Sequence, residues 1–252
     1  FPPKYIPDPS SLDDMAYKLK QNDLGVLLEK ISKEGADGMY KGEIAFAIEE
    51  DMKKNKNFLT MEDLANFRAE VKNPLSVKYR DFEVFGPTAP CGSWTTLETL
   101  NILENFDTKS MGHNSPEYLH MFVEAARHAF ADRYHYLGDP DFVDVPLSGL
   151  LSKEYAKDVS QQINKKYAEL ENSYEGDPWN HYSDIEIHDP WKYESSNPNS
   201  KLKNGEYDQN SDCTTHFSTA DKNGNLVSCT QTAVGHFGSK VVSKGLGISI
   251  SE

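Results

Sequence analysis

Apolar residues recur every three or four positions through the first part of the chain, which is the spacing of helices with one buried face. This pattern predicts helices over residues 11–34 and 40–54, and Gly35 marks the end of the first. The apolar stripe of the first helix consists of Leu24, Leu27, Leu28 and Ile31. Thr60 then has the side chain of an N-cap for a short helix that runs through Phe67. The start of the chain is therefore expected to be helical.

The pattern next changes to strand-like alternation and back again. Apolar and polar residues alternate on either side of Arg80 and Asp81, which predicts a β-hairpin. A helix should follow and end near Asn105, and Ser115 is expected to cap another helix that has a proline in its first turn. The buried stripe of that helix is expected to be Leu119, Phe122, Val123, Ala126 and Phe130.

A last helix is predicted from Ser152 to about Leu170, after which the composition changes. Residues 171–212 are rich in Asn, Ser, Asp, Pro and Gly, which is typical of a long exposed loop. His181 and His188 lie there among acidic residues, a set that is able to bind a divalent metal ion. Scattered histidines in loops are more often simply solvated, so we predict no metal site.

The chain after this loop has the pattern of a second hairpin. Strand-like alternation from Thr214 is followed by a turn over residues 221–225 and by a returning strand over residues 226–232. Thr230 and Thr232 are two apart and face the same side, near the first residue of the outgoing strand. Threonine is also common in strands for steric reasons, so a purely structural hairpin is the alternative.

Thr214 is the candidate nucleophile. A threonine hydroxyl attacks an amide at neutral pH only if a base takes its proton, and the α-amino group of an N-terminal threonine is one such base. Thr214 would acquire that amine only by cleavage of the Cys213–Thr214 bond.

A series of motifs runs along nearly all of the chain. Upstream of Thr214 these are Gly35 to Ala45, Leu59 to Ala65, Leu100 to Asp107, Glu124 to Arg133 and Tyr136 to Val143. From Thr214 onward they are Thr214 to Ser218, Asp221 with Gly224-Asn225, Phe237 to Val242 and Gly245 to Ile248. In this order the motifs resemble the γ-glutamyltransferase family of N-terminal-nucleophile hydrolases. The resemblance implies an α+β fold of the αββα sandwich type, with part of its sheet supplied by chain outside residues 1–252.

The resemblance also implies how the chain is divided and what it does. Residues 1–213 correspond to the C-terminal part of a large subunit, with residues 171–212 as a loop-rich linker, and residues 214–252 to the start of a small subunit. The precursor would cut itself between Cys213 and Thr214, and Thr232 would be the second threonine that hydrogen-bonds the nucleophile. The implied activity is cleavage of γ-glutamyl amides such as glutathione through an acyl-enzyme, without cofactor or metal.

Two departures from the family pattern keep alternatives open. Relatives form the oxyanion hole with two adjacent glycines, and no such pair occurs in these 252 residues. The residues therefore resemble a central segment that needs the N- and C-terminal segments of its own precursor. Glutamyl-specific relatives also place an asparagine where this chain has Val234. An acylase acting on other acyl groups, or a segment without activity of its own, are the alternatives.

The composition limits the classes of binding partner that are expected. The net charge is −14, with 26 Lys and Arg against 40 Asp and Glu, which disfavours nucleic acid binding. No run of about 18 apolar residues is present, so no membrane span is predicted. Three cysteines cannot all pair with one another, so a disulfide framework is not expected. The composition leaves the cellular compartment open.

Overall fold

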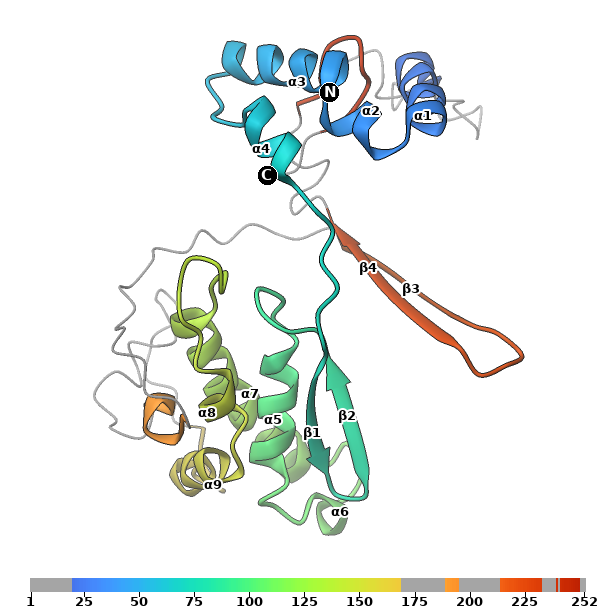
Figure 1. Ribbon diagram of the computed structural model, residues 1–252. Helices are drawn as coiled ribbons and strands as arrows, with labels where there is room; N and C mark the ends of the chain where they lie inside the picture. Colours follow the sequence, from blue (N-terminus) through green and yellow to red (C-terminus); the bar gives the residue numbers. More distant parts are fainter. Residues whose placement is uncertain (1–19, 169–188, 195–213, 233–238, 240, 250–252) are drawn as a thin grey trace, which may run out of the picture. The chain divides into compact units, whose positions relative to one another are not determined.

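The computed structural model in Figure 1 describes residues 20–168, 189–194, 214–232, 239 and 241–249. Contacts divide the chain into two compact units. Unit 1 comprises Phe1–Ala69 and Gln209–Glu252, and unit 2 comprises Glu70–Asp208.

The described residues of unit 1 form four helices and one hairpin. The helices are α1 (Asn22–Glu34), α2 (Ala36–Tyr40), α3 (Gly42–Lys54) and α4 (Met61–Asn66), and the hairpin strands are β3 (Thr214–Ala220) and β4 (Leu226–Thr232). The predicted helix over residues 11–34 begins only at Asn22, because Lys20 and Gln21 are not helical and residues 11–19 lie outside the described residues. The prediction for residues 40–54 missed a break at Lys41, which separates α2 from α3.

The cap predicted for α4 is confirmed and is reciprocal. Thr60 Oγ1 accepts a hydrogen bond of 3.2 Å from the backbone N–H of Asp63, and the Asp63 carboxylate accepts one of 2.9 Å from the backbone N–H of Thr60. Two otherwise unpaired donors at the start of α4 are therefore satisfied.

A short segment from the end of the chain completes the apolar core of unit 1. The buried cluster consists of Leu27, Ile44, Ala45, Ile48, Met52 and Leu64, from α1, α3 and α4. Leu246 and Ile248 pack against this cluster. Gly247 lies between them at φ +68°, and a Cβ atom there would lie 2.8 Å from the backbone nitrogen of Leu24. Glycine is thus needed at this position for both conformation and space.

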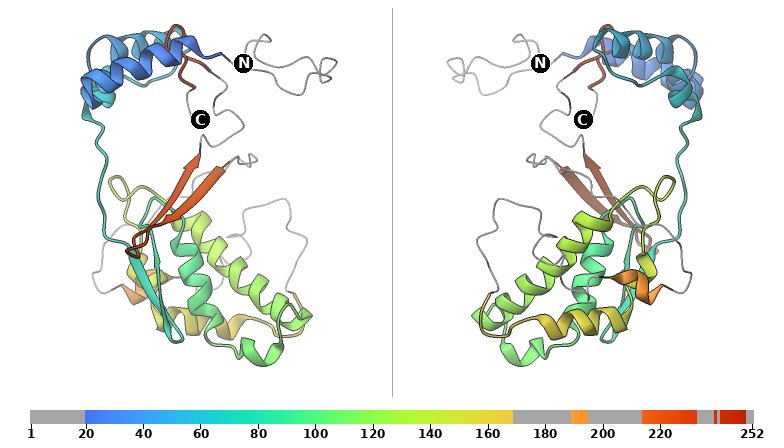
Figure 2. Two further views of the ribbon diagram at one scale, coloured as in Figure 1. Left: turned by 90° about the vertical axis from the view of Figure 1, so that its right-hand side faces the viewer. Right: turned by 90° about the vertical axis from the view of Figure 1, so that its left-hand side faces the viewer.

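Unit 2 is a helical layer with a small hairpin. Its strands are β1 (Leu75–Tyr79) and β2 (Phe82–Gly86), and its helices are α5 (Trp94–Leu103), α6 (Thr108–Met111), α7 (Pro116–Tyr136), α8 (Leu147–Leu150), α9 (Lys153–Gln162) and the 3₁₀ helix η3 (Pro190–Tyr193). Figures 1 and 2 show α5 lying between α7 and the β1–β2 hairpin. The hairpin predicted around Arg80 is confirmed, with Tyr79 paired to Phe82.

Helix α7 begins as predicted but buries a different face. The Ser115 hydroxyl accepts a hydrogen bond of 3.0 Å from the backbone N–H of Tyr118, which confirms the cap. The predicted buried stripe is wrong for the described residues, because four of its five members are 43–50% exposed: Leu119, Phe122, Val123 and Phe130. The buried face instead consists of Met121, Glu124, Ala125, His128, Ala129, Ala131, Asp132 and Tyr136. Helix α7 carries apolar residues on two faces, and their spacing alone predicted the wrong face to be buried.

Two carboxyl groups are buried where α5 meets α7. Glu98 and Asp132 are both 0% exposed, and Asp132 Oδ2 accepts a hydrogen bond of 2.6 Å from the Tyr155 hydroxyl. Neither oxygen of Glu98 has a hydrogen-bond partner among the described residues. Burial raises the pKa of Glu98 well above its ordinary value, and the negative charge of Asp132 raises it further. The fold therefore favours Glu98 in its neutral, protonated form.

A candidate active site on the threonine hairpin

The β3–β4 hairpin presents one face made of hydroxyl groups and an imidazole. Its register pairs Thr214 with Thr232, His216 with Thr230, and Ser218 with Ser228. Residues two apart on a strand face the same side, so these six side chains share one face, which we call the hydroxyl face. The opposite face carries Thr215, Phe217, Thr219, Val227, Cys229 and Gln231. Within the described residues both faces are largely open to solvent.

The register of the hairpin is fixed by its turn. Asp221 Oδ1 accepts hydrogen bonds of 2.8 Å from the backbone N–H of Asn223 and 2.9 Å from that of Asn225. The Asn225 side-chain amide donates to the other oxygen of Asp221 at 2.8 Å, and Gly224 takes a φ of +83°. These bonds from Asn225 and Asn223 lower the pKa of Asp221. A shift of one residue would break this network and move the threonines to the other face.

The hairpin brings the two predicted threonines together. Thr214 and Thr232 are directly opposite each other, and Cβ atoms of such cross-strand pairs lie roughly 4.5–5.5 Å apart. That spacing lets their two hydroxyls interact directly or through one water. Thr230, also predicted to share this side, does so one pair further along. Cys213 and Val234 lie outside the described residues.

His216 is the residue whose part in the site we did not predict from sequence. Its Nδ1 lies 2.7 Å from Thr230 Oγ1, and its Nε2 lies 3.2 Å from Ser218 Oγ and 3.1 Å from Ser228 Oγ. The sequence contained one usable signal, because His216 and Ser218 follow Thr214 at intervals of two. Their partners on β4 became visible only with the register.

The sequence profile described as Gamma-glutamyltranspeptidase matches residues 10–252. The chain belongs to the γ-glutamyltranspeptidase family. The glutathione hydrolase proenzyme of Escherichia coli K12 is 36% identical over 237 residues, a match that covers 92% of this chain and 36% of that protein. The acylase ACY 1 proenzyme of Pseudomonas sp. strain SE83 is 34% identical over 232 residues, with coverages of 92% and 36%. The chain thus spans 36% of the length of each of these two relatives.

Solved structures agree with the family. The γ-glutamyltranspeptidase of Helicobacter pylori matches with a TM-score of 0.56 and 37% identity, over 58% of this chain and 42% of that one. The cephalosporin acylase of Bacillus halodurans matches with a TM-score of 0.69 and 27% identity, over 91% of this chain and 35% of that one. The expected α+β fold of the N-terminal-nucleophile hydrolase kind is therefore confirmed. Among the described residues, β3 and β4 form a two-stranded sheet.

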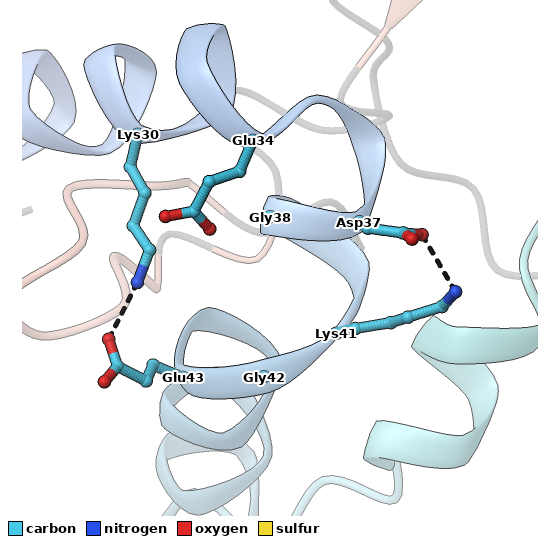
Figure 3. A pocket seen from close by; sticks show the side chains of 7 residues that line it. All are labelled: Lys30, Glu34, Asp37, Gly38, Lys41, Gly42 and Glu43. Atoms are coloured by element: carbon cyan, nitrogen blue, oxygen red, sulfur yellow. Dashed lines mark hydrogen bonds and ion pairs between the residues drawn. The ribbon is translucent and has the colours of Figure 1, made fainter.

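A family motif in unit 1, Gly35 to Ala45, contributes to a charged pocket whose charges largely pair with one another (Figure 3). The pocket is lined by Lys30, Glu34, Asp37, Gly38, Lys41, Gly42 and Glu43. Lys30 Nζ lies 2.7 Å from Glu43 Oε2, and Lys41 Nζ lies 2.9 Å from Asp37 Oδ1. The bonds from lysine lower the pKa of both carboxyl groups. These pairs join α1 to α3 and α2 to its own C-cap, which is a structural role.

The described residues contain no group of three or more His, Cys, Asp or Glu side chains arranged to hold a metal ion, and His181 and His188 lie outside them. None of the described helices is long and apolar enough to cross a membrane.

Proposed function

We propose that this chain is part of a proenzyme that cleaves itself between Cys213 and Thr214 and then cleaves γ-glutamyl amides such as glutathione. On this proposal residues 1–213 belong to the large subunit and residues 214–252 begin the small one. The observation that carries it is the register that sets Thr214 directly opposite Thr232 on the hydroxyl face. Family membership supports it, and a curated relative is named a glutathione hydrolase proenzyme.

The self-cleavage step needs only groups of the chain and one water. The Thr214 hydroxyl attacks the carbonyl carbon of Cys213, the peptide C–N bond breaks, and the acyl group moves from nitrogen to oxygen. Water then hydrolyses the ester, which leaves a carboxylate on Cys213 and a free α-amine on Thr214. That amine becomes the base that Thr214 lacked before cleavage.

The same hydroxyl then serves catalysis. The α-amine of Thr214 takes the hydroxyl proton as the oxygen attacks the γ-carbonyl carbon of the substrate, and the proton passes to the leaving amine. Water or the amine of an amino acid then releases the acyl group from Thr214. On this proposal Thr232 hydrogen-bonds the Thr214 oxygen and holds it in line for attack.

Separation of the precursor into two polypeptides is the first test. Denaturing mass analysis of the full-length wild-type protein should show two chains that meet between Cys213 and Thr214, and Thr214→Ala should give one. Thr232→Ser, which keeps the hydroxyl, should be cleaved, whereas Thr232→Val should be cleaved slowly. An uncut wild-type protein would refute the proposal.

A second candidate function is an acylase that accepts other acyl groups. Val234 favours it, because an apolar side chain cannot hydrogen-bond the polar end of a glutamyl donor. One relative is named an acylase, and one structural neighbour a cephalosporin acylase. Turnover of a γ-glutamyl anilide should be compared with that of a simple aliphatic acyl anilide. Val234→Asn should raise the glutamyl rate, and an unchanged ratio of the two rates would argue against this role for Val234.

A further inference from the structure

The centre of the hydroxyl face is held by a single imidazole. His216 lies in the middle pair of the three, between the Thr214–Thr232 pair and the Ser218–Ser228 pair. Both ring nitrogens lie within 3.2 Å of hydroxyl oxygens, so the ring is fixed from both sides.

The direction of these contacts decides what His216 is able to do. Nε2 is directed at the serine pair, which is the side away from Thr214. Nδ1 is occupied by Thr230 across the hairpin. Because Thr230 and the serine pair engage both ring nitrogens, the ring does not replace the α-amine as the base for Thr214. Any effect of His216 on Thr214 must pass through Thr230.

Thr230 is well placed to transmit such an effect. It neighbours Thr232 on its own strand at about 6.6 Å and lies diagonally across from Thr214 at about 7–8 Å, so its hydroxyl reaches that pair through one water. A neutral imidazole has one donor and one acceptor nitrogen, whereas a hydroxyl takes either role. If Nδ1 carries the proton, the Thr230 hydroxyl is left to donate toward the Thr214–Thr232 pair. If Nδ1 accepts, only the lone pairs of Thr230 remain available. In either case the ring fixes which role Thr230 offers its neighbours.

We propose that His216 is a positioning residue for the nucleophile, because its Nδ1 fixes the hydroxyl of Thr230 beside the Thr214–Thr232 pair. The proposal rests on the proposed function and adds a residue to it. Ser218 and Ser228 at Nε2 keep the ring from turning. The oriented Thr230 hydroxyl in turn orients the hydroxyls of the Thr214–Thr232 pair.

Two substitutions at position 216 separate the two nitrogens. In His216→Asn the side-chain amide reaches about the position of Nδ1, whereas in His216→Gln it reaches about the position of Nε2. Tested in the full-length protein, His216→Gln should lower kcat about tenfold, the worth of one neutral hydrogen bond, with little change in KM. His216→Asn should retain most of the rate. Precursor cleavage should slow in the same order.

Substitution of Thr230 tests whether the effect of His216 on Thr214 passes through the Thr230 hydroxyl. Thr230→Val should lose as much rate as His216→Gln, and Thr230→Ser should retain it. The double variant His216→Gln/Thr230→Val should be no slower than either single variant, because both remove the same link. Thr219→Val, on the opposite face and nearly unchanged in shape, should leave kcat unchanged.

Specific results would overturn the inference. Wild-type kcat in His216→Gln, equal losses in the Asn and Gln variants, or losses that multiply in the double variant would each refute it. If the position 216 variants fail to fold, equal rates in Thr230→Val and Thr230→Ser would refute it instead. These outcomes are distinct from failure of the proposed function, which would appear as an uncut wild-type precursor.

Discussion

Replacing Glu98 with glutamine should make unit 2 more stable at neutral pH, although it removes a native residue. Glu98 is fully buried beside Asp132, and its pKa is raised by burial and then by that neighbouring charge. In the unfolded chain the carboxyl group ionises near its ordinary pKa of about 4.5. Folding above that pH must therefore return a proton to the buried group. Glutamine has nearly the same shape and needs no proton.

The sign and size of the effect follow from this one proton. Because the folded pKa lies above the unfolded one, the wild-type protein has its full stability below the unfolded pKa and loses stability as the pH rises toward the folded pKa. The loss is about 1.4 kcal/mol per pH unit for one proton. Glu98→Gln should lack this slope, so the gap between the two proteins should widen as the pH rises above about 4.5, by at most about 1.4 kcal/mol per pH unit.

Urea denaturation at a series of pH values measures the effect directly. All three tryptophans of the sequence lie between residues 70 and 208, so their fluorescence reports unit 2. Glu104→Gln is the matched control. Burial raises the pKa of Glu104, but its hydrogen bonds from Lys153 and from the backbone of Arg80 outweigh this and hold the pKa below the ordinary value. That variant should lose stability above pH 4.5. Parallel pH curves for the wild-type protein and Glu98→Gln would refute the reasoning.

Three further predictions concern stability. Gly247→Ala should destabilise unit 1 by about 1–3 kcal/mol, because the residue has a positive φ and no room for a Cβ, and faster hydrogen exchange in α1 would show it. Tyr155→Phe should cost about 1–3 kcal/mol in urea denaturation, since buried Asp132 loses its 2.6 Å donor; an unchanged midpoint would contradict this. Ser115→Ala should cost about 1 kcal/mol in the same assay through the lost cap of α7, whereas Ser115→Asp should cost little.

Local signals in the sequence predicted local structure well. The caps at Thr60 and Ser115 depend on bonds to residues three positions away, so the necessary partners are visible in the sequence itself. Spacing about the turn at Asp221 predicted that Thr230 and Thr232 both lie near Thr214, and the register pairs Thr214 with Thr232, the threonine that the family resemblance had singled out.

Features that depend on distant partners were missed. The buried face of α7 is chosen by its packing on α5, and it includes Glu124, His128 and Asp132, which no hydrophobic count would place inside. The role of His216 likewise depends on hydroxyls from β4 that lie 12 and 14 residues away. The role of such a polar residue can be predicted only when its partners in space are known.

The packing of Leu246 and Ile248 against α1, α3 and α4 has a consequence for the proposed maturation, which is cleavage of the Cys213–Thr214 bond. These two side chains come from the part of the chain after Thr214, whereas the helices beneath them come from the part before it. A cut at the Cys213–Thr214 bond would free one end without detaching the polypeptide that carries it. The cleaved protein should therefore elute as a single species in gel filtration, and its two polypeptides should separate only in denaturant. Maturation would then add a reactive terminus while the assembly keeps its mass.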